Sequence, residues 1–118
     1  MNVRDIMEIL EADIIWASET GLNAEVHTAC GSDMMSDVLA FVKDQSVLLT
    51  GLVNPQVVRT ADMMEMHCIV FVRGKVPDDS IIELAKERDI VLLNTRFRMF
   101  TACGRLYQRG LRGGCEKE

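Results

Sequence analysis

The sequence predicts a single three-layer α/β/α domain with a mainly parallel, mixed sheet. Apolar segments typical of buried strands begin near Val47, Ile69 and Val91, evenly spaced along the chain. A stretch with helical periodicity follows each of them. An alternation of strand and helix implies right-handed crossovers, which build a parallel sheet with helices on both faces.

The composition supports one globular domain. The chain has 118 residues, of which 48% are hydrophobic and 26% are charged. The net charge of −5 argues against an extended surface for nucleic acid or an anionic membrane. A local basic cluster can still bind a small anion. We therefore expect neither a nucleic acid nor a membrane as partner.

The sequence favours a cytoplasmic location. No apolar segment approaches the roughly 20 residues that span a bilayer. The first residues, Met1 to Asp5, are too acidic for a signal peptide.

The N-terminal quarter predicts one helix and two strands. Asn2 caps a helix whose buried face is formed by Val3, Ile6, Met7 and Leu10. Strands are expected over 13–17 and 25–30, with a turn over 19–23 between them. That turn is too short for a parallel crossover, so the two strands are antiparallel or lie in different layers.

The regular part begins at Gly31, where Ser32 and Asp33 break a strand and cap a helix. We expect its buried face to hold Met35, Val38, Leu39 and Val42, and that of the helix opening at Asn54-Pro55 to hold Val57, Val58, Ala61 and Met64. The helix opening at Pro77 buries Ile81, Leu84 and Ala85. The last helix, capped by Asn94 or Thr95, carries Met99, Phe100, Cys103, Leu106 and Tyr107.

The domain should span 1–109, with a flexible Gly-rich tail over 110–118.

The residues that could ligate a metal or act in catalysis form no recognisable pattern. Cys30, Cys68 and Cys103 are expected to be buried, with Cys115 in the tail, and their spacing matches no zinc or iron–sulfur site. Glu25 and His27 share a strand face, but no nucleophile accompanies them in a recognisable order. We expect no metal, no cofactor and no catalytic residue.

Polar and basic residues follow the three regular strands. They are Thr50, Gly51 and Asn54, then Arg73, Gly74 and Lys75, then Asn94, Thr95, Arg96 and Arg98. The carboxyl ends of parallel strands share one edge, where helix N-termini and arginines can bind an anion. The alternative is that the arginines are solvated loop charges, and that Asn54 and Thr95 are helix caps only.

A second candidate surface is apolar. The Met-rich segment from Asp62 to Met66 covers more than one helical face. Either Met64 is core and the other residues are ordinary surface, or the segment is a subunit interface. Phe97 and Phe100 could belong to the same surface.

From Val3 to about Leu106 the chain resembles the DRTGG domain, which is related to the N-terminal domain of HPr kinase/phosphorylase. The likeness lies in the first helix (3–10), in Leu48-Leu49-Thr50-Gly51, and in residues 75–95. One departure stands at the glycine corner. Where the family places an Asp-Arg pair after the glycine, this chain has Leu52 and Val53. The two charged groups are thus replaced by apolar ones.

The resemblance implies a regulatory or dimerising domain without catalysis of its own, found in some nucleotide-responsive proteins. Together with the basic edge, it predicts a homodimer that binds a small anionic ligand, such as an adenine nucleotide or a phosphometabolite. The expected ligand contacts are Thr50, Gly51, Asn54, Arg73, Thr95, Arg96 and Arg98. The alternative that the resemblance suggests is a protein-interaction adaptor without a small ligand, accessory to an anaerobic, iron hydrogenase-type system.

Overall fold

The computed structural model describes residues 1–41 and 46–114. Its five strands form one sheet in the order β1-β5-β4-β3-β2. Strands β2 to β5 are parallel to one another, and β1 pairs with β5 in the antiparallel sense. The strand bounds are β1 Asp13–Trp16, β2 Thr28–Gly31, β3 Ser46–Thr50, β4 Cys68–Phe71 and β5 Val91–Asn94. The predicted mixed, mainly parallel sheet is confirmed.

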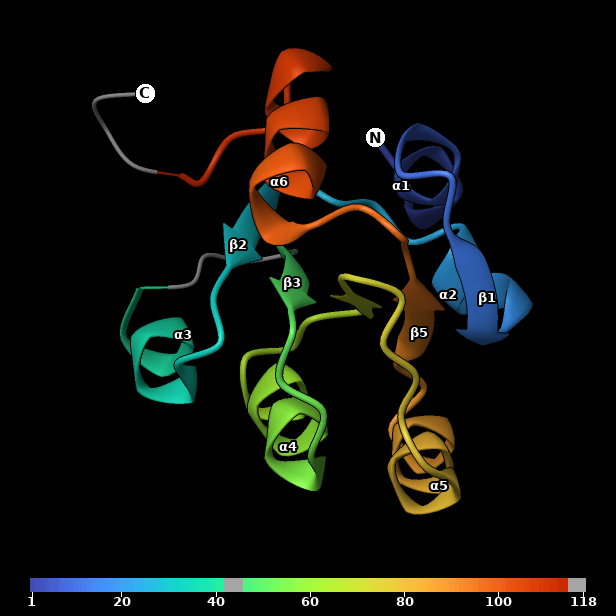
Figure 1. Ribbon diagram of the computed structural model, residues 1–118. Coiled ribbons are helices and arrows are strands. Elements are labelled where there is room, and N and C mark those ends of the chain that lie inside the picture. The colour runs from blue at the N-terminus through green and yellow to red at the C-terminus, as the bar shows by residue number, and fades with distance from the viewer. Residues whose placement is uncertain (42–45, 115–118) are drawn as a thin grey trace.

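Helices cover both faces of the sheet (Figure 1). Helices α1 (Val3–Ile9) and α6 (Met99–Gln108) lie on one face, with the short α2 (Glu19–Leu22) beside α1. Helices α3 (Met35–Phe41), α4 (Pro55–Met63) and α5 (Asp79–Glu87) lie on the other. The chain is therefore a three-layer α/β/α domain, as predicted.

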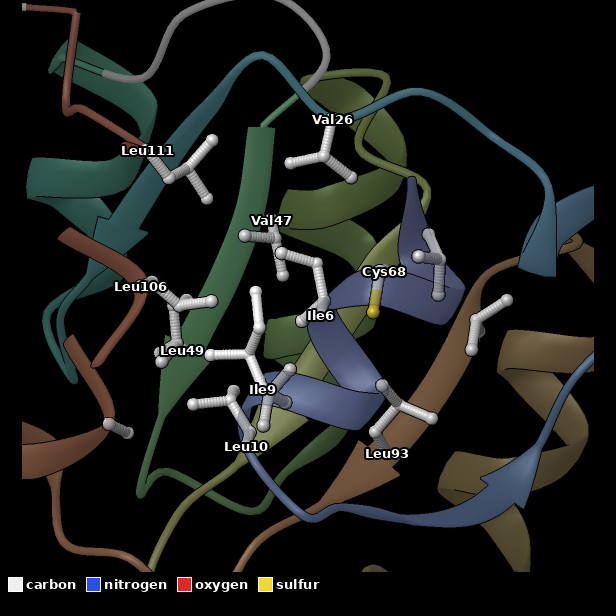
Figure 2. Packing of buried hydrophobic residues seen from close by; sticks show 14 of the residues in the cluster. Ile6, Ile9, Leu10, Val26, Val47, Leu49, Cys68, Leu93, Leu106 and Leu111 are labelled. Atoms are coloured by element: carbon white, nitrogen blue, oxygen red, sulfur yellow. The ribbon is translucent and has the colours of Figure 1, made fainter. Parts of the chain in front are cut away.

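The central strands bury both of their faces, which explains why they read as continuous apolar runs. Val47, Leu49, Cys68 and Leu93 point toward α1 and α6, where they meet Ile6, Ile9 and Leu10 (Figure 2). The alternate strand residues pack against α3, α4 and α5; they are Leu48, Ile69, Phe71 and Leu92. This alternation fixes the register of each strand and hence the position of its carboxyl end.

The N-terminal region differs in part from the prediction. The expected turn over 19–23 contains α2, because the Ser18 side chain accepts a hydrogen bond from the Gly21 N–H and caps a short helix. The two early strands do not pair with each other; β1 and β2 occupy opposite edges of one sheet. They run in opposite directions, so the predicted antiparallel sense holds and the predicted separate layer does not.

The observed helix starts confirm some of the predicted N-caps and contradict one of them. Asn2 and Asp5 form the capping box of α1, as expected from the polar start of that segment. Asp78 caps α5, and hydrogen bonds from Ser80 and Ile81 hold the pKa of its carboxyl below the usual range. The cap predicted for α6 is wrong: α6 begins at Met99 with Arg98 as N-cap residue, and neither Asn94 nor Thr95 caps it.

The predicted core needs correction at Leu39 and at Met64, and a third predicted position is not described by the structure. Leu39 is 38% exposed, so α3 buries Met35 and Val38 instead. The fully buried methionine after α4 is Met66, because the chain leaves the helix in a left-handed turn at Glu65 (φ 55°) and returns to the core. Val42 lies outside the described residues.

The segment after α6 lies partly on the domain. Leu111 is buried in the core under α6, and the Ala29 N–H donates to the Arg112 carbonyl oxygen at 2.9 Å. These contacts cover part of the outer edge of β2. The predicted boundary between residues 109 and 110 stays a prediction, and residues 115–118 lie outside the described part of the chain.

Candidate functional site

The carboxyl ends of β3, β4 and β5 lie next to one another, which is the arrangement predicted for the ligand site. Thr50 is the register partner of Phe71, and Phe71 is that of Asn94. The loops that follow these strands therefore share one edge of the sheet. Strand β2 ends beside them, where the Ser32 N–H donates to the Leu49 carbonyl oxygen.

The Thr50–Gly51 corner is occupied by a carboxylate of the chain itself. Asp33 Oδ1 accepts hydrogen bonds from the Gly51 N–H at 2.6 Å and from Thr50 Oγ1 at 3.1 Å. Thr50 Oγ1 also accepts from the Leu52 N–H at 3.1 Å. The donors predicted to hold a ligand anion thus already hold an anionic group, and the corner is filled from within.

Sequence reasoning missed this role of Asp33. A Ser-Asp pair between a strand and a helix is typical of an N-cap, so we assigned Asp33 to α3. Because β2 is adjacent and parallel to β3, the residue after β2 instead reaches the end of the neighbouring strand. Only the strand order reveals that contact.

Arg73 lies across the same corner. A Cβ atom built on Gly51 would stand 2.6 Å from Arg73 Nη2 and 3.5 Å from Asp33 Oδ1, so the bare glycine backbone makes room for the guanidinium. Arg73 and Gly74 both have positive φ, 60° and 68°, and form a tight turn after β4.

That turn is joined to the loop after β5. The Arg73 N–H donates to the Phe97 carbonyl oxygen at 2.9 Å, and the Gly74 N–H donates to the Thr95 carbonyl oxygen at 2.7 Å. The backbones that carry Arg73 and Arg96 are therefore held together, as the sequence predicted. Lys75 follows in the same turn and is exposed.

Thr95 has a structural role. It is 2% exposed, and its Oγ1 donates to the Leu10 carbonyl oxygen at 2.7 Å. The Phe97 N–H donates in turn to Thr95 Oγ1 at 3.3 Å. This hydroxyl ties the end of β5 to the end of α1 and is satisfied within the fold.

Asn54 behaves differently from the cap that we predicted. It precedes α4 in the N-cap position, but its side chain makes no capping hydrogen bond. Its Oδ1 is buried and accepts no hydrogen bond from the described part of the chain. A buried acceptor without a donor is costly, so the Asn54 side chain is an unsatisfied polar group at this edge.

Arg96 and Arg98 are exposed charges of the site, as are Arg73 and Lys75. Within the described ranges neither Arg96 nor Arg98 has a carboxylate oxygen within 4.0 Å. Arg105, by contrast, pairs with Glu11 at 3.3 Å and lies over the Phe97 ring, 4.5 Å from its centroid. The charge of Arg105 is therefore already used inside the fold, whereas the charges of Arg96 and Arg98 face solvent.

A hollow of about 280 Å³ lies beside Arg96. It is lined by Leu10, Glu11, Asp13, Thr95, Arg96 and Phe97. The lining combines one guanidinium with two carboxylates and an aromatic ring, so it presents hydrogen-bond donors and acceptors to the same small volume. Its size is close to the lower end of small-molecule pockets.

The remaining sequence candidates do not join this site. Cys30 and Cys103 are half-buried rather than fully buried as predicted, and desolvation raises the pKa of both thiols. Burial also raises the pKa of the Cys68 thiol. Glu25 pairs with the N-terminal ammonium group at 3.4 Å instead of forming an acid/base pair with His27. Among residues 1–41 and 46–114, no three His, Cys, Asp or Glu side chains are grouped to hold a metal ion.

The predicted joint Met/Phe surface is wrong. Met63 ends α4 on one face of the sheet, whereas Phe100 lies on α6 on the opposite face. Each is largely exposed, 69% for Met63 and 89% for Phe100, and the two side chains belong to helices on opposite faces of the sheet. Phe97 belongs to neither, because it is half-buried beneath Arg105.

The structure is a three-layer α/β/α domain whose strand ends bring polar and basic loops to one edge. None of the described residues forms a helix that is long and apolar enough to cross a membrane. The sequence pattern of the DRTGG domain matches residues 5–108. The chain belongs to the DRTGG domain family, as the resemblance indicated. No curated protein matches the sequence significantly.

A solved structure shares the fold. It contains the CBS and DRTGG domains of the regulatory region of Clostridium perfringens pyrophosphatase, in complex with its activator diadenosine tetraphosphate. The TM-score is 0.75 at 19% sequence identity. The match covers 91% of this chain and 46% of that one, so the present chain spans about half the length of that protein. In that protein the DRTGG domain is part of a regulatory region.

Proposed function

We propose that the chain is a non-catalytic regulatory module that binds a small anionic ligand, such as an adenine nucleotide, at the carboxyl edge of its sheet. The observation that carries this proposal is the pair Arg96 and Arg98, exposed and without a carboxylate partner in the described part of an otherwise acidic chain. Guanidinium groups bind phosphate through two parallel hydrogen bonds, which suits them to this ligand class.

The neighbouring groups support a phosphate at this position. Arg73 is held beside the loop of Arg96 by two backbone hydrogen bonds, so a third guanidinium stands at the same edge. Asn54 adds a buried oxygen without a donor at the same edge, which a ligand amino or hydroxyl group reaches only when the Asn54 side chain turns outward.

Thr50 and Gly51 can contact a ligand only under one condition. Their donors bind Asp33, so a ligand anion reaches them only when it displaces that carboxylate. Thr95 likewise contributes its position in the backbone, since its hydroxyl is bonded to Leu10. Arg73, Arg96 and Arg98 are therefore the principal ligand contacts.

A regulatory role agrees with the related fold. The pyrophosphatase region that contains a DRTGG domain was solved with a dinucleotide activator, and this supports a nucleotide as the ligand class of the present chain.

We propose a homodimer as the working form and the cytoplasm as its location.

A thermal-shift panel tests the ligand. The panel contains adenosine mono- and diphosphate, adenine dinucleotides, inorganic phosphate and phosphorylated metabolites. Each compound is added to the wild-type chain and to the double variant Arg96→Ala/Arg98→Ala. We expect at least one nucleotide to raise the Tm of the wild type and the double variant to lose that rise. Arg59→Ala, an exposed arginine on α4, is the matched control. The proposal fails if no compound shifts the Tm, or if the double variant keeps the shift.

A protein-interaction adaptor is the second candidate, favoured by the exposure of Phe100 and Met63. It requires no small ligand. Binding of a partner protein that Phe100→Ser abolishes, together with an inert nucleotide panel, would establish the adaptor in place of the ligand-binding module.

A further inference from the structure

The face that carries α1 and α6 has an uneven distribution of charge. Residues 95–114 contain five arginines and no acidic residue. Residues 1–25 contain six acidic residues and a single arginine, Arg4. On the helices themselves the difference is smaller: α6 and its C-cap carry Arg105 and Arg109 and no acidic residue, whereas α1 carries Asp5 and Glu8 beside Arg4. Because α1 and α6 lie side by side on the same face of the sheet, a basic helix stands next to a helix of net negative charge.

The charges at the seam between these helices are only partly paired within the chain. Arg105 pairs with Glu11, and Arg4 is turned away toward Glu19 at 2.8 Å. Glu8 and Arg109 both line a hollow of about 210 Å³ between α1 and α6, and they form no ion pair with each other. The seam therefore keeps an exposed acid and an exposed base opposite each other.

The outer side of α6 carries two exposed aromatic rings, and the Arg112 guanidinium lies over one of them, 3.8 Å from the Tyr107 ring centroid. Phe100, Gly104 and Tyr107 lie three and four residues apart, so they share one side of the helix. Phe100 is 89% exposed and Tyr107 49%. Gly104 has no atom of the described chain within 4 Å of the position of its Cβ, so internal packing does not require a glycine there. A glycine in mid-helix lowers helix stability, but it lets another backbone approach closely.

We propose that the α1/α6 face is the interface of a homodimer whose two-fold axis runs between and along the two helices. Such an axis lays α6 of one protomer over α1 of its partner, and the reverse, so basic meets acidic twice. An axis across the helices would instead lay α6 on α6 and bring arginines together. The charge pattern thus selects the first arrangement. This interface rests on the dimer of the proposed function and not on its ligand.

Three residues of α6 and its C-cap have distinct roles at this interface. Arg109 of one protomer approaches the acidic side of the partner's helix α1, where Glu8 lies. Phe100 is buried against that helix. Gly104 allows the two helices to come close.

Charge reversal in two different chains gives the decisive test. Arg109→Glu and Glu8→Arg are made separately, and each variant is studied alone and as an equimolar mixture by sedimentation velocity over a range of concentrations. Each variant alone places like charges together twice, so we expect its dimer Kd to rise about tenfold or more. In the mixture, the carboxylate introduced into one chain meets the guanidinium introduced into the other, while the wild-type pair is kept on the opposite side. The mixture should recover the wild-type Kd as a heterodimer.

Two further variants serve as an independent test of the interface and as a control. Phe100→Ser should weaken the dimer without lowering the Tm of the monomer, because the ring is almost fully exposed. Arg59→Glu makes the same charge reversal on α4, on the other face, and should leave the Kd unchanged. A monomeric wild type, a mixture no tighter than its components, or an equal effect of Arg59→Glu would overturn the proposal. A wild-type monomer that still binds nucleotide would overturn the interface and leave the ligand site standing.

Discussion

Two strand ends at the same edge of the sheet differ in whether their polar groups have partners within the chain. At the end of β3, Asp33 satisfies the Gly51 N–H and the Thr50 hydroxyl. After β5, Arg96 and Arg98 form no ion pair with a carboxylate of the described residues. A fold that needed these charges only for its own stability would be expected to pair them. The contrast therefore separates a corner that completes the architecture from a loop that is available to a ligand.

The largest expected effect on stability is that of Asp33→Ala. It leaves the buried Gly51 N–H without its acceptor and should lower the free energy of unfolding by about 1–2 kcal/mol. Denaturant unfolding monitored at Trp16 measures the loss. Asp33→Asn keeps one acceptor oxygen and should cost less.

The same variant also tests whether the corner can hold an outside anion. Added phosphate or acetate should stabilise Asp33→Ala more than the wild type, because it can occupy the vacated position beside Arg73. Equal stabilisation of both proteins would show that the corner does not bind free anions and that the Asp33 contact is structural only.

A somewhat smaller loss is expected for Thr95→Val. This change removes the hydroxyl that donates to the Leu10 carbonyl oxygen while keeping the side-chain shape, and should cost about 1 kcal/mol. Thr101→Val, on the exposed side of α6, is the matched control and should be nearly neutral. If both variants lose the same stability, Thr95 does not act through this hydrogen bond.

Gly51→Ala should have the smallest effect on folding. The new methyl group meets the end of the flexible Arg73 side chain, which can move aside, so we expect a change within about 0.5 kcal/mol. Its effect on ligand binding should be larger, because it displaces the Arg73 guanidinium. A loss of several kcal/mol would mean that Arg73 is fixed in place by the fold.

How far the sequence predicted this structure depends on the range of the contacts. The buried runs of β3, β4 and β5 and the helix cap at Asn2 rest on local patterns, and these predictions are confirmed. The convergence of Thr50, Arg73 and Arg96 followed from the parallel sheet alone.

The errors arise from contacts between segments distant in sequence. Asp33 resembles a cap, but it serves the adjacent strand, and the order of strands is not readable from local pattern. Thr95 resembles a cap as well, but its partner Leu10 lies at the other end of the chain. The predicted Met/Phe surface failed for the same reason, because sequence periodicity does not show on which face of the sheet a helix lies.

The most direct test of the ligand-binding account is a titration of the wild-type chain and Arg96→Ala/Arg98→Ala with adenine nucleotides by isothermal calorimetry. We expect saturable binding to the wild type and a loss of at least about tenfold in affinity in the double variant, with the Tm of the free protein unchanged. Equal affinity in the two proteins, or no binding to the wild type, would contradict it.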